Sequence, residues 1–350
     1  MTKNILKINE LAKNILLSIV SIIIFLVIFE FLLRFFHFGE SMERIEPVIL
    51  MKSSNGKIFY EMKPNSYMMR DSVNITINSK GMRDIGYAYN KPNGTYRIAV
   101  IGDSVTSAVY LNLSQVYTEI LERKLNSIAK RYGVLNFGVN GYDTLQEVEV
   151  LKTKALKFNP DMIIVGYVLN DPFPSDAIIG FFNRIDDRKQ SACKIPLISL
   201  MMPCALADFI NNLKTIKFAH EKWLNIKAKF EDDFYTALYS KNSTWQSLSD
   251  SFKEIDSAAK KKNIKVVVVI FPILKNLQDY KWAEIHSRVA QRAEKNGFYV
   301  IDILDEYKKY KDEELKIQDT DIYHPNRLGH EIAADAIYKR LLNVINVSSS

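Results

Sequence analysis

Two distant segments of the chain carry side-chain types that act together in acyl transfer. The first is Gly102–Ser104, and the second is Asp321–His324. A serine hydroxyl is hardly ionised at neutral pH and needs a base before it can act as a nucleophile. A histidine with a carboxylate three residues earlier supplies both the base and the group that orients it. The pattern therefore predicts a serine esterase that uses Ser104, His324 and Asp321.

His324 is the preferred base among the five histidines of the chain. It stands directly before Pro325, in a loop that precedes the last helical pattern. Asp319 is a second carboxylate able to orient its ring. The remaining histidines lie at the edge of the apolar N-terminal run or in helical patterns, where surface or packing roles are expected: His37, His220, His286 and His330.

Two further loops offer donors for the negative oxygen that develops when an ester is attacked. In enzymes, each such donor contributes about 3 kcal/mol. The loop over residues 136–141 contains two glycines, which let backbone amides approach a substrate closely. The loop over residues 169–171 contains Asn170, whose side-chain amide can donate a hydrogen bond.

The elements that must position these residues follow a strand–helix alternation. Short apolar runs bounded by turn signals predict strands at Ile98–Ile101, Val134–Phe137, Asp161–Leu169, Val266–Phe271 and Phe298–Ile303. Helical spacing of apolar residues predicts a last helix from about Leu328 to Val344. This alternation predicts an α/β fold with a doubly wound, mostly parallel five-stranded sheet. Such sheets bind ligands at the carboxyl ends of their strands, where all the residues above are expected to meet.

The N-terminus predicts a membrane anchor. Residues 15–36 form an apolar run of about 22 residues, which as a helix extends roughly 33 Å and is long enough to cross a bilayer. Three lysines precede it, so residues 1–14 are expected in the cytoplasm and the rest of the chain outside. A cleavable signal peptide and a buried core helix are the alternatives, although the run ends without the small residues of a cleavage site.

The remaining segments complete the expected organisation. Residues 37–95 form a membrane-proximal segment with short strands, such as Val73–Ile77, and residues 96–345 form the catalytic domain. An insertion at about 172–238 interrupts this domain. It contains Cys193 and Cys204, for which a disulfide and two buried thiols remain equally open. No histidine cluster accompanies these cysteines, so no metal site is predicted.

Charge and composition limit the classes of function that the chain can have. The formal net charge is +7 and 47% of residues are hydrophobic, which is typical of a globular protein with a mild attraction for anionic surfaces. Lysine and arginine do not gather in a stripe beside aromatic residues, so a nucleic-acid partner is not expected.

The four segments, taken in order, resemble the conserved blocks of the SGNH hydrolase superfamily, also called GDSL lipases and acylhydrolases. The similar segments are Gly102–Thr106, Asn136–Gly141, Leu169–Asp171 and Asp321–Asn326. The resemblance implies a flavodoxin-like fold with Ser104 as nucleophile, Gly141 and Asn170 as oxyanion donors, and His324 and Asp321 as base and acid. It implies no metal or organic cofactor.

The chain departs from the family pattern at two places and resembles a subgroup at a third. Val168 stands where the third block usually has glycine, and Ser107-Ala108 stand where the first block often has one. Upstream, Asn78–Arg83 is similar to a segment that precedes the serine block in membrane-anchored members encoded near polysaccharide gene clusters.

These observations predict a single-pass bacterial membrane protein with an extracytoplasmic esterase domain. The expected substrates are O-acyl groups, above all O-acetyl groups, on cell-envelope glycans, followed by lipid esters. One alternative is an O-acyltransferase that uses the same triad, aided by a multi-span membrane acyltransferase. A second is a catalytically silent scaffold that binds the envelope, and a third is a phosphate-binding flavodoxin-like module.

Overall fold

The computed structural model describes residues 2–35, 46–70, 72–128, 131–172, 234–319 and 321–346. The chain divides into two compact units. One comprises Ile45–Phe182 and Asp233–Ser350, and the other comprises Met1–Arg44 and Asn183–Asp232. Most of the predicted insertion, with Cys193, Cys204 and His220, lies outside the described residues, as does His37.

The described part of the N-terminal unit is helix α1, Thr2–Phe35. Among the residues that the structure describes, no helix has both the length and the apolar character needed to cross a membrane. The transmembrane anchor predicted over residues 15–36 is therefore not confirmed.

The larger unit is built on a five-stranded sheet in which every neighbouring pair is parallel. The strands are β5 (Tyr96–Gly102), β6 (Tyr132–Asn136), β7 (Met162–Val168), β8 (Lys265–Phe271) and β9 (Tyr299–Asp302). Their order in the sheet is β6-β5-β7-β8-β9, which confirms all five predicted strands and their parallel arrangement. β7 and β8 are almost fully buried, as is typical of strands in a parallel sheet that is covered on both faces.

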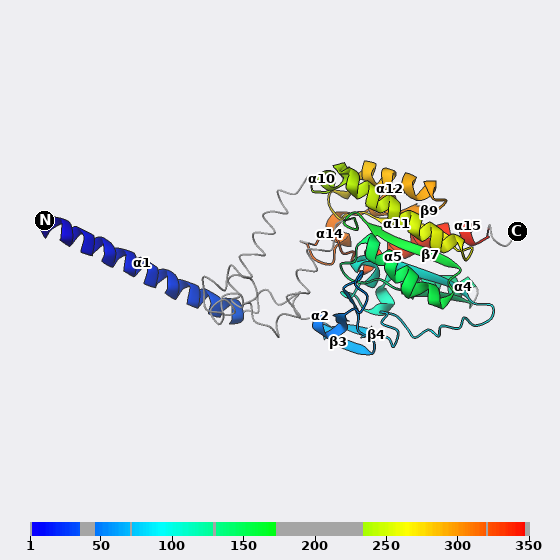
Figure 1. Ribbon diagram of the computed structural model, residues 1–350, viewed down its shortest axis with the longest axis horizontal. Helices are drawn as coiled ribbons and strands as arrows, with labels where there is room; N and C mark the ends of the chain where they lie inside the picture. Colours follow the sequence, from blue (N-terminus) through cyan, green and yellow to red (C-terminus); the bar gives the residue numbers. More distant parts are fainter. Residues whose placement is uncertain are drawn as a thin grey trace. The chain divides into compact units, whose positions relative to one another are not determined.

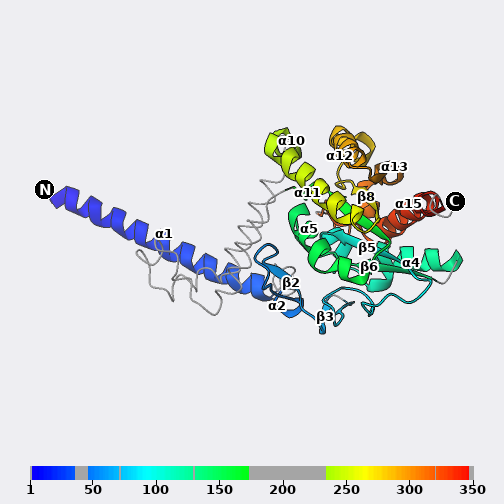
Figure 2. The ribbon, with the colours of Figure 1, turned by 45° about the vertical axis from the view of Figure 1, so that its right-hand side comes forward.

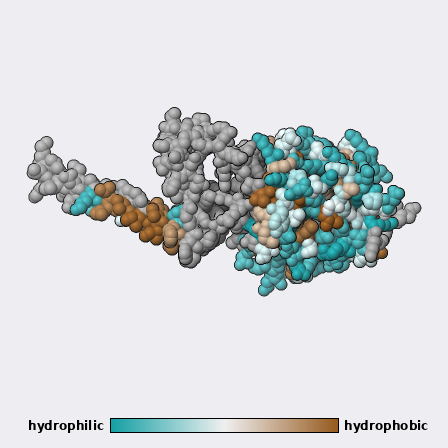
Figure 3. All heavy atoms as spheres, turned by 90° about the horizontal axis from the view of Figure 1, so that it is seen from below, coloured by the Kyte–Doolittle hydropathy of each residue, from teal (hydrophilic) through white to brown (hydrophobic). Residues whose placement is uncertain are grey.

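Helices cover both faces of this sheet (Figures 1 and 2). α4 (Tyr117–Ile128) packs against α15 (Arg327–Asn346) on one face. α5 (Thr144–Thr153), α11 (Asn242–Lys260) and α12 (Ala283–Lys295) cover the other face. The predicted last helix is confirmed as α15. In the view of Figure 3, the described surface of the larger unit is mostly hydrophilic with some apolar patches, whereas that of α1 is largely apolar. The buried apolar side chains of the larger unit form one core around the sheet.

Shorter elements complete the unit. They are α2 (Glu46–Ile49), α3 (Ser104–Ser107), α10 (Phe234–Ser240), α13 (Leu304–Tyr307), α14 (Asp312–Leu315), and the 3₁₀ turns Leu113–Gln115, Ala155–Phe158 and Leu277–Asp279. Two antiparallel hairpins precede the sheet: β1 (Leu50–Lys52) with β2 (Tyr60–Met62), and β3 (Ser66–Arg70) with β4 (Val73–Ile77). The predicted strand at Val73–Ile77 is thus confirmed. Apolar residues of both hairpins belong to the same buried core as the sheet.

Gly138 allows the loop after β6 to pass very close to α3. A Cβ atom at this position would lie 2.5 Å from the backbone nitrogen of Ser107 and 2.7 Å from the Cβ of Thr106. Because the nearest of these atoms is backbone, the contact cannot be relieved by turning a side chain. The absence of a side chain at Gly138 therefore sets the spacing between two loops at the carboxyl edge of the sheet.

Replacing Gly138 with alanine is expected to lower the free energy of unfolding by about 1–3 kcal/mol, because the added methyl group forces the two loops apart. Urea denaturation of the full-length chain measures this. Gly86→Ala is the matched control, since an added Cβ there meets no atom within 4 Å. Equal midpoints for the two variants would contradict the expectation.

Glu147, in the first turn of α5, is a buried carboxyl group without a hydrogen-bond partner for either of its oxygens among the described residues. Burial raises its pKa well above the ordinary value, and the nearby carboxylates of Asp171, Asp103 and Asp143 raise it further. Glu147 therefore binds a proton more tightly in the folded chain than in the unfolded chain.

This raised pKa predicts a stability that depends on pH. The unfolded chain releases the Glu147 proton above about pH 4.3, whereas the folded chain retains it, so folding stability falls as pH rises from there toward the folded-state pKa. The glutamine of Glu147→Gln cannot ionise. The free energy of unfolding of this variant, relative to wild type, is therefore expected to increase between pH 4 and pH 8, by up to about 1.4 kcal/mol per pH unit. Urea denaturation at several pH values tests this, with the exposed Glu313→Gln as control. A constant difference across this range would show that Glu147 is ionised in the folded chain.

Candidate functional site

Ser104 lies at the turn where β5 ends and α3 begins. Asp103 precedes it as the N-cap residue, and its side chain accepts a hydrogen bond of 2.8 Å from the backbone N–H of Val105. This capping interaction holds the turn, and it leaves the Ser104 side chain half-buried at the carboxyl edge of the sheet. Burial raises the pKa of Asp103, although the hydrogen bond from Val105 and the nearby His324 oppose the shift.

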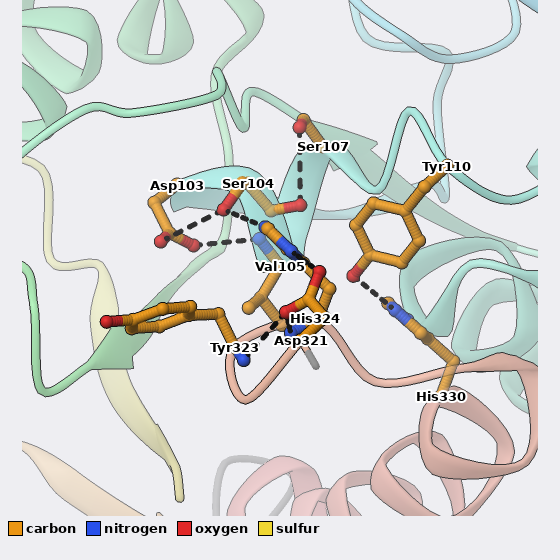
Figure 4. Close-up of polar contacts among 9 residues, drawn as sticks. All are labelled: Asp103, Ser104, Val105, Ser107, Tyr110, Asp321, Tyr323, His324 and His330. Atoms are coloured by element: carbon orange, nitrogen blue, oxygen red, sulfur yellow. Dashed lines mark hydrogen bonds and ion pairs between the residues drawn. The ribbon is translucent and has the colours of Figure 1, made fainter. Parts of the chain in front are cut away.

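The structure brings Ser104, His324 and Asp321 into one hydrogen-bonded chain (Figure 4). The Ser104 Oγ lies 2.8 Å from His324 Nε2, and His324 Nδ1 lies 2.7 Å from Asp321 Oδ2. Because the carboxylate accepts the Nδ1–H, Nε2 is the nitrogen free to accept the serine proton. The three side chains therefore form a Ser–His–Asp hydrogen-bond pattern, with the imidazole between the hydroxyl and the carboxylate.

Asp321 is held as a carboxylate by several donors. Its Oδ1 accepts backbone N–H bonds from Tyr323 at 2.9 Å and from His324 at 3.0 Å. Burial by itself would raise the pKa of Asp321, but the hydrogen bonds from the His324 ring and from these two amides outweigh it and lower the pKa. Asp319, the second predicted orienter, is not the residue that bonds the His324 ring.

The loop that carries His324 is tied to the rest of the unit through its backbone. Ile317 N–H donates to the carbonyl of His324 at 3.0 Å, and Leu274 N–H donates to that of Ile322 at 2.8 Å. The side chain of Asn326 donates to the carbonyls of Glu314 and Lys316. These contacts keep the loop at the carboxyl edge of the sheet, beside the start of α15.

Asn170 approaches the serine through a shared neighbour. Asp103 Oδ2 lies 3.4 Å from Asn170 Nδ2 and also 3.4 Å from Ser104 Oγ. The loop carrying Asn170 is closed by Asp171, whose Oδ2 accepts the Val168 N–H at 2.8 Å. Val168, in place of the usual glycine, contributes a buried side chain here. The predicted donor is thus linked to Ser104 through Asp103.

Gly141 is connected to the site less directly. It has a positive φ of 74°, a conformation that glycine adopts without strain. Its neighbour Asn140 is held by the hydroxyl of Tyr60, which donates to its carbonyl at 2.6 Å, and by the hydroxyl of Ser107. The structure places this loop beside α3, while no described hydrogen bond joins Gly141 itself to Ser104.

Two other histidines are buried and have packing roles, as expected from the sequence. His286 Nδ1 lies 2.9 Å from Asp302 Oδ2, and its Nε2 lies 3.1 Å from the hydroxyl of Tyr280. His330 is bonded between the backbone of Tyr117 and the hydroxyl of Tyr110. Across the described residues, no group of three histidine, cysteine, aspartate or glutamate side chains has the geometry of a metal site.

Arg83 and Ala108 are structural features of the site that sequence reasoning missed. Arg83 is buried and donates to the carbonyls of Ser107 at 2.8 Å, Ala108 at 2.7 Å and Leu111. Ala108 has a left-handed conformation, with φ at 43° and ψ at 45°. Glycine is the residue usually found in this conformation. The only signals in the sequence were the resemblance over Asn78–Arg83 and the missing glycine after Thr106.

The chain is similar to several solved structures. The lipase/acylhydrolase from Enterococcus faecalis is 16% identical, with 71% of this chain and 95% of that chain covered and a TM-score of 0.40. An acetylxylan esterase from Geobacillus stearothermophilus is 14% identical, with 71% and 95% covered and a TM-score of 0.42. The psychrotrophic esterase EstA from Pseudoalteromonas sp. is 11% identical, with 71% and 98% covered and a TM-score of 0.42. Structural similarity at these identities and TM-scores does not indicate the substrate of this chain.

No curated protein matches the chain. Residues 100–332, by contrast, match the profile of a single family, and this stretch contains the serine turn, both candidate oxyanion loops and the His324 loop. The match therefore covers Ser104, Gly141, Asn170, Asp321 and His324, whereas Arg83 lies before it. On this evidence the chain belongs to the GDSL-like lipase/acylhydrolase family.

Proposed function

We propose that this chain is a serine esterase that cleaves O-acyl esters through Ser104, His324 and Asp321. The observation that carries the proposal is the continuous hydrogen-bonded chain from Ser104 Oγ through His324 to Asp321, with contacts of 2.8 Å and 2.7 Å. Side chains separated by 220 residues of sequence meet there in the geometry that proton transfer requires. Membership of a family of ester hydrolases supports the same reaction.

The reaction follows from this geometry. His324 Nε2 takes the hydroxyl proton as Ser104 Oγ attacks the ester carbonyl, and the imidazolium that forms is stabilised by Asp321. The amide of Asn170, with the backbone N–H groups of Ser104 and Gly141, donates to the oxyanion. His324 then returns the proton to the leaving alcohol. Water, deprotonated by the same imidazole, releases the acyl group as a carboxylic acid.

The proposed substrates are O-acyl groups, above all O-acetyl groups, on cell-envelope glycans, followed by lipid esters. The support for this choice comes from the sequence: the resemblance over Asn78–Arg83 and the basic residues before the apolar N-terminal run. The location outside the cytoplasmic membrane, with the N-terminus inside, stays a prediction. So does a multi-span membrane acyltransferase as partner.

Ser104→Ala is expected to reduce the hydrolysis of p-nitrophenyl acetate by the full-length chain by on the order of 10⁴-fold or more, because Ser104 is the only hydroxyl or thiol hydrogen-bonded to the His324 ring among the described residues. Labelling by a fluorophosphonate probe, which reacts with an activated serine, is expected to disappear in the same variant. Thermal unfolding of both proteins controls for folding.

Other outcomes of this experiment would identify the alternative functions. If Ser104→Ala retains wild-type turnover, the proposed triad is wrong. If wild type takes the probe label but transfers acetyl groups to a glycan acceptor without releasing acetate in water, the chain is an acyltransferase. If wild type neither hydrolyses esters nor takes the label, it is a silent scaffold.

Asn170→Ala is expected to lower kcat by about 10²-fold with little change in KM, because the amide would donate more strongly to the oxyanion than to the uncharged ester. Steady-state kinetics with p-nitrophenyl acetate measures the two constants separately. Asn296→Ala is the control, because the Asn296 side chain at the end of α12 donates to the carbonyl of Arg292, which is not part of the site. A kcat within threefold of wild type would remove Asn170 from the proposed mechanism.

A further inference from the structure

Tyr110 lies on the loop that follows α3 and packs against the ring of His324. The ring centroids are 4.8 Å apart and the planes are inclined by 55°. Tyr110 is half-buried, and Figure 4 shows its ring beside His324 with the hydroxyl directed toward His330. One side of the imidazole is therefore occupied by an aromatic ring that makes no part of the Ser–His–Asp chain.

His330 fixes the hydroxyl of Tyr110, and its protonation follows from its contacts. Its Nδ1 lies 3.2 Å from the backbone nitrogen of Tyr117, whose N–H can only donate, so Nδ1 carries no proton. In the neutral ring the proton is then on Nε2, which donates to the Tyr110 hydroxyl at 3.2 Å. Burial lowers the pKa of His330 to about 3, and the nearby Arg83 and His324 lower it further. This histidine is therefore a permanent donor rather than a proton carrier.

Arg83 fixes the backbone of the same loop. Its guanidinium bonds three carbonyls between residues 107 and 111, so the segment that carries Tyr110 is held on both sides of the tyrosine. Burial lowers the pKa of Arg83 to about 10, which still leaves it charged at neutral pH. Tyr110 is thus anchored at its backbone by Arg83 and at its hydroxyl by His330.

His324 needs such a support because rotation about its Cβ–Cγ bond has a broad energy profile. A small rotation carries Nε2 away from Ser104, and misplacement by about 1 Å can cost on the order of 10²-fold in rate. Asp321 restrains one edge of the ring, but it does not occupy its face. The tyrosine ring blocks motion toward its own side, and its π electrons lie near the positive charge that His324 acquires during catalysis.

We propose that Tyr110 is a positioning residue for His324, held in place by His330 and Arg83. This inference rests on the proposed esterase function, since it assigns Tyr110 a role through the base of that reaction. It gives a role to Arg83, the last residue of the segment Asn78–Arg83, and to His330, which is not part of the triad.

The test compares Tyr110→Phe with Tyr110→Leu in the full-length chain, using p-nitrophenyl acetate. Tyr110→Phe keeps the ring but loses the hydrogen bond to His330, and its kcat is expected to fall about threefold. Tyr110→Leu loses the ring as well, and its kcat is expected to fall about thirtyfold. The KM of both variants is expected to stay within about twofold of wild type. Tyr280→Phe and Tyr280→Leu are the matched controls. Tyr280 is buried and, like Tyr110, its hydroxyl bonds a histidine Nε2, at 3.1 Å, but outside the triad.

Several results would overturn the inference. They are an unchanged kcat in Tyr110→Leu, an equal fall in Tyr280→Leu, or a change confined to KM, which would make Tyr110 a substrate contact. If Ser104→Ala is inactive while Tyr110→Leu is normal, only this inference fails. If Ser104→Ala remains active, the proposed function fails instead.

A measurement on the wild-type chain tests the anchoring without relying on the activity of a variant. In ¹⁵N-histidine-labelled protein, His330 is expected to show an unprotonated Nδ1 and a protonated Nε2 that do not change between pH 5 and pH 8. The resonances missing from the His330→Gln spectrum identify this residue. A proton on Nδ1, or a titration within this range, contradicts the anchoring of Tyr110.

Discussion

The contact of 2.8 Å between Ser104 Oγ and His324 Nε2 is the interaction on which the site depends. It joins a turn after β5 to a loop before α15, and no local feature of the chain brings these segments together. The parallel sheet does so, because strands that run in one direction deliver their following loops to one edge. The packing of α15 against α4 then places the His324 loop over that edge. Ester chemistry here is thus a consequence of long-range packing.

The residues around this contact are held mainly by buried polar groups that each serve more than one purpose. Asp103 caps α3 through Val105 and also lies within reach of Ser104 and Asn170. Asp171 closes the Asn170 loop through Val168, and its carbonyl accepts the N–H of Thr144 at the start of α5. A buried polar group is costly unless it is hydrogen-bonded, so each of these bonds also specifies one arrangement of the loops. The oxyanion loops and the serine turn are therefore coupled through their structural supports.

The sequence was sufficient to predict the five strands, the last helix and the meeting of Ser104, Asp321 and His324. These features depend on apolar periodicity and on the geometry of parallel sheets, which are properties of short segments and of topology. Arg83, Tyr110 and His330 could not be found in this way. Arg83 donates to backbone carbonyls, and because every residue has one, these partners leave no signal in the sequence. Tyr110 packs against the His324 ring, and this contact corresponds to no regular spacing of residue types. The membrane anchor is the opposite case. The apolar run at residues 15–36 strongly predicted a membrane-spanning helix, but the described helix α1 does not confirm it.

Ala108 shows why the support of the serine loop matters. A left-handed conformation costs alanine roughly 1 kcal/mol or more relative to glycine, so it persists only where surrounding contacts enforce it. Arg83 provides that enforcement by binding the carbonyl of Ala108 together with those of Ser107 and Leu111. Glycine would remove the strain, but it would also let the loop explore other conformations and carry Tyr110 with it. The left-handed alanine and the buried arginine thus act together: they lower the stability slightly and hold the loop that carries Tyr110 in one conformation beside the His324 ring.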